Sequence, residues 1–168
     1  MPKKKVKDYI EELSIPKEEF GGMPICPYAH VHLSEDKMDL REWDPKKTSI
    51  FDEIVAFNKS KYRSTAWYVK DMKDLFKEGT AEETNKWTDN VNEQLLDIYE
   101  EYKIEEAIVV VTFNPNDNLG VGDVKPRAMS PYFIVGVVYL EELNDAHDKL
   151  EESKYFDKMI GEYKEQLV

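Results

Sequence analysis

The sequence has little of what secreted and membrane proteins depend on. It holds one cysteine in 168 residues, so an intramolecular disulfide is excluded and a reducing, cytoplasmic location is expected. The start, "MPKKKVKDYIEEL", has lysines but no apolar stretch after them, which argues against a secretory signal. The longest apolar runs, 107–113 and 132–140, fall well short of the roughly 18 residues of a membrane-spanning helix. Both runs are instead typical of buried strands.

Basic residues are also in deficit. The chain carries 35 acidic against 23 basic side chains, and its formal net charge is −12. Phosphate backbones and anionic lipid headgroups repel such a chain, so neither nucleic acid nor a membrane is expected as a partner. A small molecule or another protein remains as the expected partner.

The chain does have enough apolar material for one core. With 41% apolar residues, positions 1–168 are expected to form a single globular domain. Its periodicities predict an α/β (α+β) fold with a mixed sheet of about four strands covered by helices, parallel early and antiparallel late. The expected elements are a helix at 6–13, a strand and turn within 31–40, a helix at 50–57, a strand at 64–70, a helix at 81–102, strands at 107–113 and 132–140, and a last helix from 143 to 163.

Chemically reactive side chains gather in one stretch, "GGMPICPYAHVHL" at 21–33. Cys26, His30 and His32 offer one thiolate and two imidazoles, a ligand set suited to zinc or another transition metal. If the segment is extended, His30 and His32 share one face, which permits joint ligation and equally permits two ordinary surface imidazoles. Structural zinc motifs usually come in two halves, and the sequence has no second half.

Cys26 also has two interpretations without a metal. As a catalytic nucleophile it needs a lowered thiol pKa, for which His30 is a candidate neighbour. As a buried, inert residue it would simply anchor its loop, because free cysteine is among the most buried residue types. The sequence leaves both interpretations open.

A second loop of interest is "NPNDNLGVGDVKPRAMSP" at 114–131. Its glycines, Gly120 and Gly122, could let backbone amides approach an anion, and Arg127 beside Ser130 would complement the charge. A flexible turn explains the same composition, since glycine and asparagine are common in turns for conformational reasons.

The layout of the chain resembles a family of short bacterial proteins that is defined as a domain of unknown function. Members carry Cys-Pro-Phe-Ala after a first helix, then a strand ending Phe-His-Pro and a Ser-Pro-Tyr-Pro segment. The corresponding text here is "CPYA" at 26–29, "TFNP" at 112–115 and "SPYF" at 130–133, within a resemblance over roughly 5–160. Asn114 replaces the family histidine, His30 replaces a lysine, and Arg127 is displaced from its place before Ser-Pro. The resemblance implies this fold and no known activity.

Two hypotheses of function follow. In the first, the two loops meet at one end of the sheet, and a small ligand-binding or enzyme-like protein uses Cys26, His30 and Arg127 as catalytic residues, with His32 as a further metal ligand. In the second, the protein has no catalytic role and contacts a protein partner through its acidic surface or an exposed aromatic patch.

Overall fold

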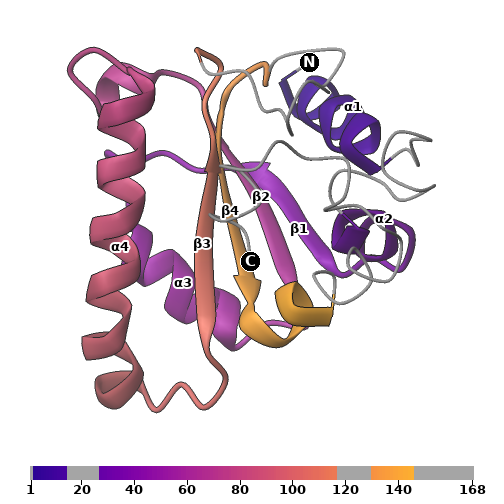
Figure 1. Cartoon of the computed structure of the whole chain (residues 1–168), viewed down its shortest axis with the longest axis vertical. Coiled ribbons are helices and arrows are strands. Elements are labelled where there is room, and N and C mark those ends of the chain that lie inside the picture. The colour runs from indigo at the N-terminus through magenta and orange to yellow at the C-terminus, as the bar shows by residue number, and fades with distance from the viewer. Residues whose placement is uncertain (1, 15–26, 117–129, 146–168) are drawn as a thin grey trace, which may run out of the picture.

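The computed structural model describes residues 2–14, 27–116 and 130–145, which contain a four-stranded mixed sheet. The strand order is β1-β2-β4-β3; β1 and β2 are parallel, and β4 is antiparallel to both of its neighbours (Figure 1). β1, β2 and β3 therefore run in the same direction. The predicted fold class, with its early parallel and late antiparallel pairs, is confirmed. The strands are β1 (Met38–Glu42), β2 (Ser64–Val69), β3 (Ile108–Phe113) and β4 (Phe133–Tyr139).

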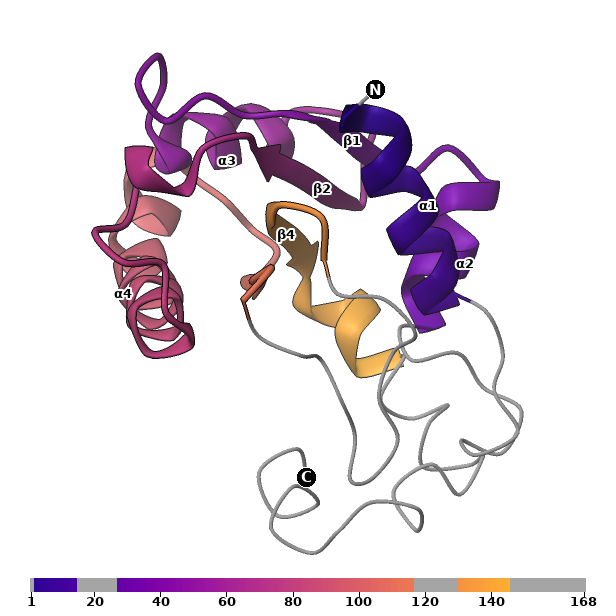
Figure 2. The same ribbon diagram turned by 90° about the horizontal axis from the view of Figure 1, so that it is seen from above.

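Helices cover both faces of this sheet (Figure 2). α3 (Ile50–Asn58) and α4 (Ala81–Tyr102) pack on one face against side chains such as Trp67 and Phe133, and form the larger core. α1 (Pro2–Ser14) and α2 (Pro27–Ser34) pack on the other face against Ala66, Tyr68 and Ile134. β2 and β4 are buried on both faces, so neither alternates apolar with exposed polar residues; the two polar residues of β2, Ser64 and Thr65, are buried and hydrogen-bonded. A 3₁₀ helix (Met72–Asp74) follows β2, and a helical turn begins at Leu140.

The helix starts follow the expected capping chemistry. Ser49 accepts a hydrogen bond from the Asp52 amide at the start of α3, and Thr80 accepts one from the Glu83 amide at the start of α4. The Glu83 carboxylate turns back to accept from the amides of Glu78 and Gly79. These hydrogen bonds fix where both helices begin, as their sequences predict.

The prediction for residues 31–40 is partly wrong. This segment first completes α2, which starts at Pro27 and ends at Ser34, and only then forms β1. Proline is well suited to the first turn of a helix because its missing N–H would have no partner there. Asp36 then adopts a left-handed conformation, φ 56°, which turns the chain into β1. The last predicted helix lies outside the described residues beyond Asp145.

The outer edge of β3 is hydrogen-bonded by side chains of α4. Asn92 accepts from the amide of Val110 at 2.8 Å and donates to its carbonyl at 2.9 Å. The Tyr99 hydroxyl accepts from the Ile108 amide and donates to the Ile108 carbonyl. At Ile108 and Val110, two side chains thus supply the hydrogen bonds that a neighbouring strand would otherwise make, which obstructs the addition of a further strand at these positions.

Replacing Asn92 with alanine should destabilise the protein by about 1–3 kcal/mol, because both backbone groups of Val110 lose their partners. Denaturant unfolding measures the change. Asn90→Ala is the matched control, since Asn90 is exposed on the same helix and should change stability by less than about 0.5 kcal/mol. Equal effects of the two substitutions would show that the edge hydrogen bonds do not contribute.

Candidate functional site

The residues expected to carry chemistry are described only in part. Cys26 and Arg127 lie outside the described residues, and so does the side chain of His30, whose backbone belongs to α2. The expected meeting of the two loops lies outside them too. His32 is described fully, and its surroundings decide what it can do.

The expectation that His30 and His32 share the face of an extended segment is wrong. The segment is helical, and positions two apart on an α-helix lie about 200° apart around its axis. His32 is 2% exposed. Its Nδ1 lies 2.7 Å from the Ser64 hydroxyl, and its Nε2 lies 3.4 Å from the Glu142 carboxylate. Both ring nitrogens therefore have protein partners.

Arg63 extends this set of contacts. Its Nε donates to Glu142 at 3.0 Å, its two terminal nitrogens donate to Glu106 at 3.1 Å each, and its guanidinium lies 4.1 Å from the centre of the Tyr139 ring. The Arg63 hydrogen bonds hold the pKa of Glu106 below its usual range. Burial opposes ionisation of Glu142, but Arg63 and His32 outweigh it and lower the pKa of that carboxyl as well.

Burial also lowers the pKa of His32, more than the neighbouring Glu142 carboxylate raises it. The imidazole is therefore neutral at pH 7. In the arrangement that satisfies every group, Ser64 donates to Nδ1 and the Nε2 proton points to Glu142.

Serine, histidine and a carboxylate are the residue types of a hydrolytic triad. Ser64, however, is 0% exposed at the start of β2, so a substrate cannot reach its hydroxyl. Its hydrogen bond to His32 instead ties α2 to the sheet. We conclude that Ser64, His32 and Glu142 join three elements and are not a catalytic site.

Metal binding gains no support from the described part of the chain. Across residues 2–14, 27–116 and 130–145, no group of three histidine, cysteine, aspartate or glutamate side chains is placed to hold a metal ion. The set that includes Cys26 and His30 stays a prediction, because those side chains lie outside that part.

Asn114, at the position where the sequence comparison above places a histidine, also has both polar atoms of its side chain hydrogen-bonded. Its amide nitrogen donates to the Gly79 carbonyl and the Thr84 hydroxyl, and its oxygen accepts from the Asn116 amide. The residue joins the end of β3 to the start of α4. Its location is the opposite end of the sheet from Ser64 and His32.

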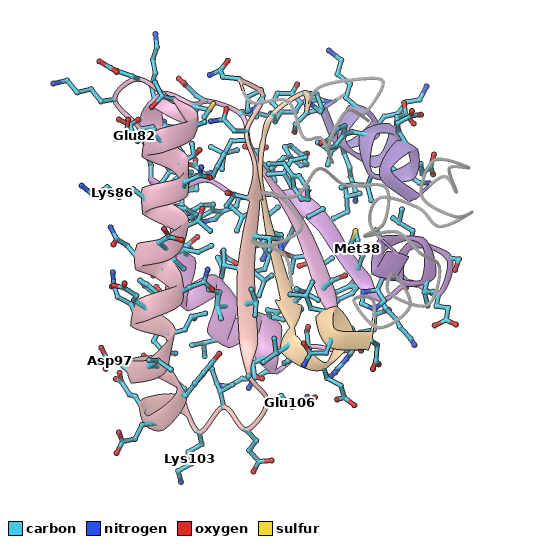
Figure 3. The ribbon with its side chains drawn as sticks, in the orientation of Figure 1. Met38, Glu82, Lys86, Asp97, Lys103 and Glu106 are labelled. Carbon is cyan, nitrogen blue, oxygen red and sulfur yellow. The ribbon has the colours of Figure 1, made fainter. Side chains whose placement is uncertain are left out.

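A different kind of site lies along the outer edge of β1. Lys37 and Trp43 hydrogen-bond to the β2 side, and since backbone groups alternate along a strand, those of Met38, Leu40 and Glu42 face away from β2. Within the described part of the chain no other strand pairs with them. Figure 3 places Met38 between β1 and the helix pair α1 and α2.

A hollow of about 490 Å³ runs along this edge. Two exposed lysines of α1, Lys3 and Lys7, line one wall, and Tyr62 lines the other. The remaining lining residues come from α2, the following turn and β1: His32, Leu33, Asp36, Met38, Asp39, Leu40 and Arg41. The hollow therefore offers backbone hydrogen-bonding groups at its floor and charged side chains on its walls.

Charges beside the edge are organised around Arg41. Its guanidinium donates to Asp39 at 2.9 Å and to Glu53, and lies 4.8 Å from the centre of the Trp67 ring. Burial disfavours the charged form of Arg41, but the two carboxylates outweigh it and raise the pKa of the guanidinium. Asp39 also accepts a hydrogen bond from the Trp67 indole. These contacts hold both side chains beside the open strand.

Residues 38–42 contain no cysteine, histidine or serine, so the sequence does not single this edge out as a site. The available signal was the alternation in "MDLRE" at 38–42, which marks a half-exposed strand with opposite charges at its second and fourth positions. Which strand lies at the edge depends on strand order, which the sequence does not reveal.

Comparison with protein-family models, with curated proteins and with solved structures finds no match to this chain. Among the described helices, none combines the length and the apolar character needed to cross a membrane. The functional inference therefore depends on the geometry of this chain alone.

Replacing His32 with glutamine should flatten the pH dependence of stability between about pH 7 and pH 5. The unfolded chain binds a proton on this histidine near pH 6.5, while the folded chain binds it only at lower pH, so the wild type loses stability as the pH falls through that window. Denaturant unfolding at several pH values measures both slopes. His30 and His147 are present in both proteins and cancel in the comparison.

The carboxyls Glu106 and Glu142 have lowered pKa values, so their contribution is lost below about pH 4.5, outside this window. Identical slopes for the wild type and the variant between pH 7 and pH 5 would contradict the assignment of His32 as a buried, neutral residue.

Proposed function

We propose that this protein is a non-catalytic interaction protein whose β1 edge accepts an extended polypeptide segment as an added strand. The observation that carries the proposal is the contrast between the two edges of the sheet. Asn92 and Tyr99 hydrogen-bond the outer groups of Val110 and Ile108 on β3, whereas within the described part of the chain the outer groups of Met38 and Leu40 have no strand partner and lie beside the hollow. The unpaired N–H and C=O groups of an edge strand are a template for pairing with another chain.

The geometry of the hollow suits an extended segment. Main-chain hydrogen bonds to Met38, Leu40 and Glu42 would supply affinity, and alternate side chains of the segment would point to the two walls. One wall carries Lys3 and Lys7, and the other carries Tyr62. Both charged and aromatic contacts are therefore available to select a partner.

The polar residues that the structure describes give less support to a catalytic function than to this interaction function. The side chains of Ser64, His32 and Asn114 form hydrogen bonds that join elements of the fold. The ligand-binding or enzymatic hypothesis depends on Cys26, His30 and Arg127 and stays a prediction. A cytoplasmic location, inferred from the single cysteine, is part of our proposal.

Leu40→Pro tests the proposal directly. The Leu40 amide faces away from β2, so proline removes a hydrogen-bond donor from the open edge without removing a β1–β2 hydrogen bond. Leu40→Ala is the matched control, because it shortens the side chain and keeps the amide. Circular dichroism establishes that both variants are folded.

The probe is a library of random heptapeptides, selected on the wild-type protein. Peptides that bind the edge should bind Leu40→Pro at least about tenfold more weakly, retain binding to Leu40→Ala, and slow hydrogen exchange of the Leu40 amide. Selection of no peptide that discriminates the two variants would refute the proposal.

A further inference from the structure

Resting on the proposed function, we infer that the segment added at this edge is β1 of a second copy of the chain. The two strands pair antiparallel about Leu40, and the two sheets become one continuous sheet. This partner follows from the segment "MDLRE" at 38–42. Its backbone hydrogen-bonding groups and its charges complement those of a second copy related by two-fold rotation.

Backbone hydrogen bonding fits this register. When Leu40 lies opposite the partner's Leu40, Met38 lies opposite the partner's Glu42. All three of these positions direct their N–H and C=O groups away from β2. In an antiparallel pair, opposed residues that both face the partner exchange two hydrogen bonds. The Glu42 carbonyl already accepts a hydrogen bond from the Arg41 guanidinium at 3.4 Å, so it meets the partner with its second lone pair.

Side-chain charge complements the same register. Asp39 lies opposite the partner's Arg41, and Arg41 lies opposite the partner's Asp39, on the face of the sheet that carries α3. Both side chains retain exposure for this contact, 20% for Asp39 and 37% for Arg41. Directly opposed unlike charges stabilise an antiparallel pair. The pairing thus adds a second ion pair to Asp39 and a third to Arg41.

On the other face of the sheet, the partner's Glu42 would lie beside Met38. This is the side of the strand on which α1 packs, and Lys3 and Lys7 line the hollow there. The lysines would therefore meet a carboxylate of the incoming strand. A copy of β1 thus offers a carboxylate to the lysines on this face and unlike charges to Asp39 and Arg41 on the other.

Neighbouring registers are disfavoured by the same charges. Centring the pair on Asp39 places it opposite the partner's Asp39, and centring it on Arg41 places two guanidinium groups together. Both registers use the same outward backbone groups as the Leu40 register, so backbone hydrogen bonding does not favour one register over the others. Like charges directly opposite one another destabilise a strand pair, so charge selects the register centred on Leu40.

Charge-reversed variants test the pairing. Asp39→Lys and Arg41→Glu each place like charges opposite one another in a homodimer. An equal mixture of the two variants restores unlike charges at both positions. Sedimentation equilibrium at about 0.15 M salt measures association, because the Debye length of about 8 Å screens the net charge of −12 but not contacting pairs.

The wild type is expected to dimerise, each single variant to associate at least about tenfold more weakly, and the mixture to regain wild-type association. Glu82→Lys and Lys86→Glu are matched controls, since they change the net charge equally and project from α4 away from the sheet (Figure 3). Both should dimerise like the wild type. Circular dichroism verifies that Asp39→Lys and Arg41→Glu are folded.

A wild type that stays monomeric at several hundred micromolar would overturn this inference, and so would folded single variants whose mixture fails to associate. If peptides still bind in a manner sensitive to Leu40→Pro, the proposed function survives that result. A dimer that is indifferent to Leu40→Pro and to both charge reversals would overturn the inference and show that association uses another surface.

Discussion

The structure depends on one constraint, that the polar groups of every strand backbone need hydrogen-bonding partners. β2 and β4 meet it inside the sheet, where they are paired on both sides and buried on both faces. β3 meets it through Asn92 and Tyr99 of α4. Among the described strands, β1 has a strand partner on one side alone, so the proposed function is placed at its other edge.

The residues with the most reactive chemistry turn out to serve the fold where they are described. His32 is a neutral imidazole between Ser64 and Glu142, and Asn114 joins β3 to α4. Asn114 follows the end of β3, and His32 extends from α2 to Ser64 at the start of β2. Burial explains their roles, because a buried polar group is costly unless it is paired.

A short, charged edge strand reconciles solubility with specific association. The net charge of −12 keeps copies of the chain apart in general, while Asp39 and Arg41 favour one particular alignment. Because Arg41 also contacts Glu53 and the Trp67 ring, its charge is held in place before any partner arrives. Less side-chain entropy is then lost when a partner binds.

The sequence by itself determined the elements whose signals are local. The helical periods of 50–57 and 81–102, the strand at 64–70 and the apolar runs at 107–113 and 132–140 predict elements that the structure contains. The short α2 differs from the strand and turn expected within 31–40, because its eight residues carry no clear helical period. Only the tertiary structure decided that His32 meets Ser64 and Glu142, and that β1 is an edge. Those facts depend on strand order and on contacts between residues far apart in the chain, which local patterns do not encode.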